Sequence, residues 1–475
     1  MRQACCLFVV SWLLSAHFGC APYPLGDGRV PPRPLGADLP AHRAPSNPQA
    51  AVDAPEAFEE PGGVLNLRRA LAAALQNNPD LAAFSWEVRV RDARALGESL
   101  LPNPELEIEL ENFGGSGTTS GFDSAETTVL LSQLIPLAGK IEKRTRVAQL
   151  QRDLAGWDYE AARIDVCTAV VRHFVAVAAS QERVEFAQKN LGLADQVLDG
   201  ARKQVEAGAA TPLDRTRAAV AVETSRIELT RTQRAMAAAK FRLAATWGST
   251  NPAFDRVEAD LESVRPIPPH DQVLNRVDQN PRLMRWAVEI SQRRAALELA
   301  RSRAVPDLRA GAGVRRFEET DETAAVVQFS VPIPIFDRNQ AGVLEARFAA
   351  AKAAAERRAA QVRVKTELAA AYQELAAAHG EAAALSQTVL PAAAEAFDAT
   401  TKSYQAGQRS YLEMLDAQRV LFQARAQYIE ALATYHTSVA KVEGLIGEPL
   451  YDASHTDPSD SEQASQARDA EGAKP

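Results

Sequence analysis

The side chains that most often carry out chemistry in proteins are present, but they do not form any of the usual reactive sets. The seven histidines are scattered singly, and neither a His-x-x-x-His nor a Cys-x-x-Cys pair occurs, so no transition-metal site is recognisable. A glycine-rich phosphate loop and a nucleophile elbow are also missing from the sequence. We therefore expect no catalytic centre, no metal and no cofactor, and we predict that the protein is not an enzyme.

One charged segment is unusual because its charges alternate strictly with apolar residues. Residues 105–111 read Glu-Leu-Glu-Ile-Glu-Leu-Glu, and successive side chains of a strand point to opposite faces. Four adjacent carboxylates on a soluble sheet would repel one another without gain, whereas a strand between lipid and a water-filled lumen needs such a pattern. The predicted lumen-facing residues are Glu105, Glu107, Glu109 and Glu111.

Three further segments show a compatible alternation of apolar positions. The positions in phase, of which only Gln133 is polar, are Val129, Leu131, Gln133 and Ile135, then Leu308, Ala310, Ala312 and Val314, and finally Ala325, Val327, Phe329 and Val331. Each segment has about 9–11 residues, the length of a tilted membrane strand. A half-exposed strand of a soluble sheet is the commoner origin of one such run, but four of them favour a membrane sheet. Because an open edge is not tolerated in lipid, we expect other copies to complete it, with twelve strands from three chains.

The sequence also contains an internal repeat with an offset of about 200 residues. Asn78-Pro79-Asp80-Leu81 recurs as Asn280-Pro281-Arg282-Leu283. The other recurring landmarks are Pro104-Glu105-Leu106 with Pro306-Asp307-Leu308, Ile135-Pro136-Leu137 with Ile333-Pro334-Ile335, Ala207-Gly208 with Ala406-Gly407, and Gly248 with Gly447. This period is far longer than any solenoid unit. It indicates a duplicated domain, with repeats at 64–248 and 270–447.

Each repeat is expected to contain the same order of elements: a helix, two strands, a very long helix and a third helix. The helices are predicted at 67–100, 138–205 and 211–247, and again at 271–304, 338–404 and 410–446. At about 1.5 Å per residue the long helices would extend for about 100 Å, which no compact core requires. Helices of this length indicate a coiled-coil-like assembly. A soluble coiled-coil rod would explain the helices alone, but not the alternating strands.

The N-terminus has the features of a secretory signal. Arg2 is followed by an apolar run from Ala4 to Ala16, which is too short to span a bilayer. We expect residues 1–20 to be the signal peptide. Residues 14–20 resemble a lipobox with Cys20 as the acylated residue, although His17 departs from the usual leucine. Ordinary cleavage after Ala21 is the alternative.

Composition limits the remaining parts of the chain. Residues 21–60 are rich in Pro and Ala and are predicted to form a linker or a wrapped extended segment, and residues 452–475 are predicted to be a disordered tail. The net charge is −8, from 53 basic and 61 acidic residues. An acidic chain without a basic block argues against nucleic acid as a partner.

Taken together, these residues resemble the TolC-like outer-membrane efflux family over residues 64–447. Residues 330–340 (SVPIPIFDRNQ) and 133–140 (QLIPLAGK) are most similar to its heavy-metal, CzcC-like branch. The resemblance implies a mainly α fold with a small β part. It also implies a homotrimer whose twelve-stranded β-barrel in the bacterial outer membrane continues into a long α-helical barrel in the periplasm.

The resemblance also implies partners and sites at the two Ala-Gly turns. In this family such turns, here Gly208 and Gly407, are the tips that dock the periplasmic adaptor of an inner-membrane, RND-type pump. Glu413 and Asp416 match the carboxylates of an acidic entrance ring. Asp214, Tyr404 and Arg409 match residues that tie neighbouring hairpins together and keep the entrance closed.

The function that follows from the resemblance is a passive exit duct of a tripartite efflux pump for heavy-metal cations. A duct for type I protein secretion or for multidrug efflux is an alternative within the same fold. A periplasmic coiled-coil scaffold without a pore is the alternative from another class.

Overall fold

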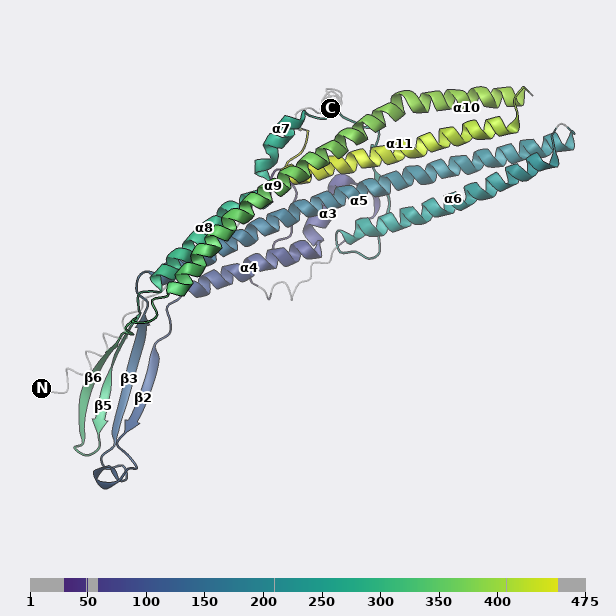
Figure 1. The fold of residues 1–475 in the computed structure, drawn as a ribbon. Helices are drawn as coiled ribbons and strands as arrows, with labels where there is room; N and C mark the ends of the chain where they lie inside the picture. The colour runs from purple at the N-terminus through teal and green to yellow at the C-terminus, as the bar shows by residue number, and fades with distance from the viewer. Residues whose placement is uncertain (1–29, 48, 50–58, 209, 407, 452–475) are drawn as a thin grey trace, which may run out of the picture. The chain divides into compact units, whose positions relative to one another are not determined.

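The computed structural model describes residues 30–47, 49, 59–208, 210–406 and 408–451 (Figure 1). The predicted signal peptide, Cys20, Gly407 and the C-terminal tail lie outside these residues. The chain forms two compact units. One contains residues 88–156 and 288–353, and the other contains residues 31–87, 157–287 and 354 onwards. Within the described ranges, none of the helices combines the length and the apolar character that crossing a membrane would require.

The first unit contains a four-stranded antiparallel sheet. Its strands are β2 (Glu105–Glu111), β3 (Glu126–Ile135), β5 (Leu308–Phe317) and β6 (Glu322–Ser330), in the order β2-β3-β5-β6 (Figure 1). Leu106 lies opposite Leu131, Leu131 opposite Ala312, and Ala312 opposite Val327. The register therefore places the predicted apolar positions of all four strands on one face. Strand β2 has seven residues, fewer than the about 9–11 of a tilted membrane strand.

Strands β3 and β5 approach each other closely at Gly313. A Cβ atom at this position would lie 2.1 Å from the carbonyl oxygen of Val129, a distance that no side chain could tolerate. Glycine is therefore required for this pairing.

Most of the chain is helical, in the predicted order but with different breaks. The helices of the first half are α3 (Leu67–Asn77), α4 (Pro79–Ser99), α5 (Lys140–Glu206) and α6 (Pro212–Ala245), with a 3₁₀ turn η1 (Gly117–Thr119). Those of the second half are α7 (His270–Asn275), η2 (Arg276–Gln279), α8 (Pro281–Ser302), α9 (Gln340–Ala384), η3 (Leu385–Val389), α10 (Leu390–Gln405) and α11 (Tyr411–Ile446). Two short strands that were not predicted, β1 (Gly63–Asn66) and β4 (Phe254–Glu258), pair in parallel.

The prediction of one uninterrupted helix at 67–100 was wrong, because the chain breaks at Asn78. This residue is extended, and its side-chain oxygen accepts a hydrogen bond from the Leu81 N–H at 2.8 Å, which caps α4. Pro79 is the first residue of α4, where its missing N–H has no consequence. The same Asn-Pro break separates η2 from α8.

The second long helix was also predicted to be continuous, but a π-helical segment, η3, separates α9 from α10. Pro391 is the second residue of α10, which begins directly after η3. A proline has no N–H to donate to the carbonyl four residues earlier, here that of Gln387. The local widening of the helix is the expected response to such a missing bond.

The recurring landmarks meet each other in the second unit. The Asn78 amide donates to the Thr246 carbonyl at 2.8 Å, and the Asn280 amide donates to the Leu445 carbonyl at 2.7 Å. Gly248 and Gly447 follow these carbonyls, both with positive φ. In each half, the Asn-Pro turn is thus held against the end of the third helix.

Residues 31–47 pack against helices of the second unit. The Arg33 N–H donates to Glu160 at 2.5 Å, and the Arg163 guanidinium donates to the carbonyls of Leu35 and Arg33 at 2.7 and 2.9 Å. The Tyr159 hydroxyl donates to the carbonyl of His42 at 2.6 Å. The side chains of Glu160 and Arg163 are nearly inaccessible to solvent, each with 4% of its surface exposed.

Candidate functional sites on the sheet and at the hairpin turns

The face of the sheet that carries the four predicted lumen glutamates also carries arginines. Arg309 of β5 forms an ion pair with Glu105. Arg315 of the same strand lies 3.3 Å from Glu111 and 3.0 Å from Glu126, and its Nε donates to Thr128 at 2.9 Å. The two arginines therefore reach across β3 to neutralise glutamates at both ends of β2.

These ion pairs were not predicted. The sequence does place Arg309 and Arg315 at positions that alternate with apolar residues, so both were expected on the polar face of the strand. Glu107 and Glu109 form no ion pair within the described part of the chain. They are the central carboxylates of β2, and both are exposed. Arg315 is shared by two glutamates, and the exposed Glu322 of β6 lies on the same face. The polar face therefore carries more carboxylates than arginines, and Glu107 and Glu109 are its carboxylates in the middle of β2.

The opposite face of the sheet is apolar and exposed. Leu106, Ile108, Leu131, Val327 and Phe329 each expose more than half of their surface. Side chains of this kind are buried in the core of a soluble sheet protein. An apolar band of this size indicates a surface that another apolar phase or another molecule covers.

The first hairpin turn joins α5 to α6. Gly208 has φ of 73°, as its place between two antiparallel helices requires. The carboxylate of Asp214 accepts from the Thr211 N–H at 3.1 Å and from its hydroxyl at 2.7 Å, and these bonds lower the pKa of Asp214. Thr211 and Asp214 thus form a capping box, with Pro212 as the first residue of α6.

The second hairpin turn joins α10 to α11 and is capped in the same way. Glu413 accepts hydrogen bonds from the Ser410 N–H at 2.9 Å and from the Arg409 guanidinium at 2.5 Å. These bonds lower the pKa of Glu413 from 4.5 to about 2. Asp416, one turn further along, lies 2.8 Å from Arg419. Both carboxylates of the predicted acidic ring therefore have arginine partners within their own chain.

The two hairpins pack against each other near their turns. Ala201 of α5, Ala218 and Val222 of α6, and Met414 of α11 form a small buried cluster. The Tyr404 hydroxyl of α10 donates to Gln204 of α5 at 2.8 Å. Burial raises the pKa of the Tyr404 phenol, and the negative charge of Asp214 raises it further.

We call the three residues that are predicted to keep the entrance closed, Asp214, Tyr404 and Arg409, the lock residues. The structure brings two of them, Tyr404 and Asp214, close to each other. Each predicted lock residue has a partner in its own chain: Asp214 bonds to Thr211, Tyr404 to Gln204, and Arg409 to Glu413. The capping roles of Thr211 and Ser410 were not predicted. The patterns Thr-x-x-Asp and Ser-x-x-Glu at the helix starts would have indicated them.

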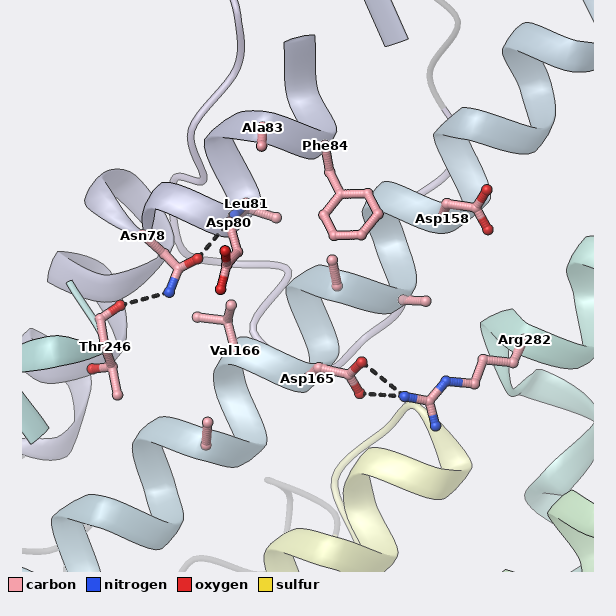
Figure 2. A pocket seen from close by; sticks show the side chains of 13 residues that line it. Asn78, Asp80, Leu81, Ala83, Phe84, Asp158, Asp165, Val166, Thr246 and Arg282 are labelled. Carbon is pink, nitrogen blue, oxygen red and sulfur yellow. Dashed lines mark hydrogen bonds and ion pairs between the residues drawn. The ribbon is translucent and has the colours of Figure 1, made fainter. Parts of the chain in front are cut away.

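A hollow of about 590 Å³ lies beside α4, α5 and the start of α8 (Figure 2). Leu81, Phe84 and Val166 contribute apolar surface to it. Asp165 forms two hydrogen bonds with Arg282, at 2.7 and 2.8 Å, and Asp158 bonds to Arg285 at 2.7 Å. Within the described residues, no group of three His, Cys, Asp or Glu side chains could hold a metal ion. The two ion pairs beside the hollow, Asp165 with Arg282 and Asp158 with Arg285, link α5 to α8.

Comparison with known proteins identifies the family to which this chain belongs. The model of the family described as "Outer membrane efflux protein" matches residues 70–249 and again residues 275–448. The chain therefore belongs to the outer membrane efflux protein family, and its location is the outer membrane with an extension into the periplasm.

The relatives confirm the predicted resemblance to the heavy-metal branch. The cobalt-zinc-cadmium resistance protein CzcC of Cupriavidus metallidurans is 31% identical over 388 residues, which are 82% of this chain and 91% of that protein. The nickel-cobalt-cadmium resistance protein NccC of Alcaligenes xylosoxydans xylosoxydans is 27% identical over 63% of this chain and 67% of its own length. A crystal structure of CusC has the same fold, with a TM-score of 0.69 and 18% identity over 86% of this chain and 98% of that chain.

Proposed function

We propose that this protein is the outer-membrane exit duct of a tripartite efflux pump and that it conducts heavy-metal cations passively from the periplasm to the outside. The observation that carries this proposal is the sheet, which has one exposed apolar face, one charged face and two strand edges, β2 and β6, without a partner among the described strands. Three copies would pair these edges and close a twelve-stranded barrel. The charged faces would then line water, and the apolar faces would contact lipid.

The same proposal assigns roles to the helices and the turns. The long helices of three copies would form a tunnel through the periplasm. The hairpin turns, at Gly208 and at Gly407, which lies outside the described residues, would dock a periplasmic adaptor that links the duct to an inner-membrane, RND-type pump. The duct would not be an enzyme, so the energy for transport would come from that pump. We further propose that the two halves, 64–248 and 270–447, are copies of one efflux domain.

Metal cations are the proposed substrate class because the relatives CzcC and NccC are resistance proteins for cobalt, zinc, nickel and cadmium, as their names state. The chain's own residues add one argument. Three copies would present six carboxylates of Glu107 and Glu109 to the lumen, and such rings favour cations over anions.

Conductance in a planar lipid bilayer tests the duct. Purified protein should add discrete conductance steps, because a closed barrel leaves a water-filled path through the membrane. A coiled-coil scaffold would add none, even with the entrance substitutions Asp214→Ala, Tyr404→Phe and Arg409→Ser, and that result would refute the proposal. The substrate is tested separately, by expressing the protein with its pump and adaptor in a metal-sensitive host. Tolerance to zinc, cobalt or cadmium should rise, whereas a duct for protein secretion would leave it unchanged.

A further inference from the structure

The apolar alternation of strand β6 continues after the strand has ended. β6 ends at Ser330, but Val331, Ile333 and Ile335 continue the same alternation as Val327 and Phe329 and are also exposed. Ile333 has 79% of its surface exposed, and Phe336, where the chain bends, has 91%. We call residues 331–336 the apolar extension. Strand β3 has a shorter one, because Leu137, beyond its end at Ile135, is also exposed.

The edge strands are shorter than the apolar part of a membrane, and this explains why an apolar extension is needed. The edge strands β2 and β6 have seven and nine residues. At about 3.3 Å per residue and a tilt of about 45°, they span only about 16–21 Å of membrane, less than the apolar band of about 25 Å that a membrane strand needs. Residues 331–333 precede the turn in which the Ile335 N–H bonds to the Ile333 carbonyl, and as an extended segment they would add about 7 Å by the same arithmetic. Strand β6 alone is too short for this band, and residues 331–333 supply the height that it lacks.

The backbone of the extension is also suited to an apolar surrounding. An N–H group without a partner is costly in lipid. Pro332 and Pro334 have no N–H, and the N–H of Ile335 donates to the Ile333 carbonyl at 2.9 Å. The other strands likewise have a proline where the chain enters or leaves the ladder, at Pro104, Pro136 and Pro306.

The extension ends sharply at charged residues. Asp337 and Arg338 follow Phe336 and are exposed, and the Arg338 Nε donates to the Pro334 carbonyl at 3.2 Å. After the shorter extension of β3, Lys140 bonds to Asp307 at 2.6 Å. A boundary between exposed apolar and exposed charged residues is what an element at the edge of a bilayer requires.

We propose that the apolar extension, residues 331–336, inserts into the periplasmic leaflet of the outer membrane and contacts phospholipid acyl chains near the glycerol backbone. This inference rests on the proposed function, because it assumes that the apolar face of the sheet contacts lipid. It adds that the lipid-contacting surface does not end with the strands and includes a segment without strand hydrogen bonds.

Quenching by brominated phospholipids tests the inference. Tryptophan is introduced as Ile333→Trp, and in separate proteins as Val327→Trp within β6 and as Val362→Trp, an exposed position of α9. Each protein is reconstituted in vesicles brominated either near the glycerol backbone or near the chain ends, and the unsubstituted protein provides the background. Val327→Trp should be quenched in both. Ile333→Trp should be quenched at least twofold more by bromine near the glycerol backbone than by bromine near the chain ends. Val362→Trp should be quenched in neither.

The outcomes separate this inference from the proposed function. If Val327→Trp is quenched and Ile333→Trp is not, the extension lies in water or against a second copy, and the inference is overturned while the duct stands. A blue-shifted emission of Ile333→Trp would then identify the second copy. If Val327→Trp is not quenched either, the sheet does not contact lipid, and the proposed function fails with it. Ile335→Trp repeats the measurement should Ile333→Trp fail to assemble.

Discussion

Two arginine–glutamate pairs show how strongly burial changes what an ion pair contributes. Arg163 and Glu160 each expose 4% of their side chains, whereas Arg183 and Glu430 expose 37% and 66%. Removal of one partner from a buried pair leaves a charge without compensation and costs about 3–5 kcal/mol. An exposed pair contributes only about 0–1 kcal/mol.

We therefore predict that Arg163→Ala destabilises the protein strongly and that Arg183→Ala, the matched control, has little effect. Arg163 also donates to the carbonyls of Arg33 and Leu35, so its loss should release residues 31–47 from α5. The midpoint of urea unfolding and proteolysis within residues 31–47 measure the two effects. Equal shifts of the midpoint in the two variants would contradict the assignment.

Single cysteine substitutions can test which side chains of β2 face the lumen. Cysteines at Glu107 and Glu109 should react with a small charged thiol reagent in the assembled protein, and cysteines at Leu106 and Ile108 should not. Burial raises the pKa of the native Cys167 thiol to about 11, so this residue should stay unreactive at neutral pH. The unsubstituted protein serves as the blank. The reverse pattern of labelling would show that the carboxylates face lipid or a partner.

At the scale of elements, the start of α11 should depend on pH because its cap is a carboxylate. The pKa of Glu413 falls from 4.5 to about 2 through bonds to Ser410 and Arg409. A lowered pKa stabilises the folded form above pH 4.5, and the stabilisation is lost as the pH falls from about 4.5 to 2. Hydrogen exchange of the Glu413 and Met414 amides, corrected for intrinsic rates, should show protection at pH 5 that disappears near pH 2.

The variant Glu413→Gln should remove this pH dependence, because the amide cannot lose or gain a charge in this range. Glu430→Gln, an exposed position in the middle of the same helix, should leave it unchanged. If the protection of the two amides in the unsubstituted protein is the same at pH 5 and pH 2, then the carboxylate does not hold the cap.

The elements that the sequence predicted best are those with a long, regular pattern. The 67-residue helix α5 and the four alternating strands lie close to their predicted ranges, because helical and strand periods persist over many residues. The breaks at Asn78 and at η3 were missed, since a single proline decides them locally. The pairing of Arg309 and Arg315 with glutamates was missed because it depends on the strand order β2-β3-β5, which no single segment contains.

At the scale of the whole molecule, the charge of the proposed entrance is lower than its carboxylates alone suggest. Glu413 and Asp416 are paired with Arg409 and Arg419, so two negative and two positive charges cancel in each chain. Replacing both acids with alanine would leave two positive charges per chain around the opening. We therefore predict that this variant shifts the ion selectivity of the duct towards anions. A trivalent cation, which a ring of carboxylates would bind, should not block its conductance.

Removing the arginines instead of the carboxylates should change the ion selectivity in the opposite direction. Arg409→Gln with Arg419→Gln leaves only the carboxylates and should raise cation selectivity. Reversal potentials in a salt gradient across a planar bilayer measure both variants. The same reversal potential in both variants and in the unsubstituted protein would show that these residues do not line the conducting path.

The resting state of the entrance is the last property that the tips should control. Among the described residues, the hairpin ends are held together by a small apolar cluster, by the bond from Tyr404 to Gln204 and by a long bond from Gln418 to Asn190, so few contacts fix their position. Each exposed polar contact contributes only about 0–1 kcal/mol, but three copies would multiply a set of them to a few kcal/mol. That is enough to favour a closed state strongly. An adaptor that offers competing contacts at the tips could then open it.

We predict that Asp214→Ala combined with Tyr404→Phe and Arg409→Ser raises the resting conductance of the duct. Asp214 also caps α6, so a loss of the cap could produce the same result. The matched control is Thr211→Ala, which removes the hydroxyl that bonds to Asp214 and keeps the carboxylate. If the control alone raises conductance as much as the triple variant, the cap and not the lock controls the entrance. If neither protein differs from the unsubstituted duct, these residues do not hold the entrance closed.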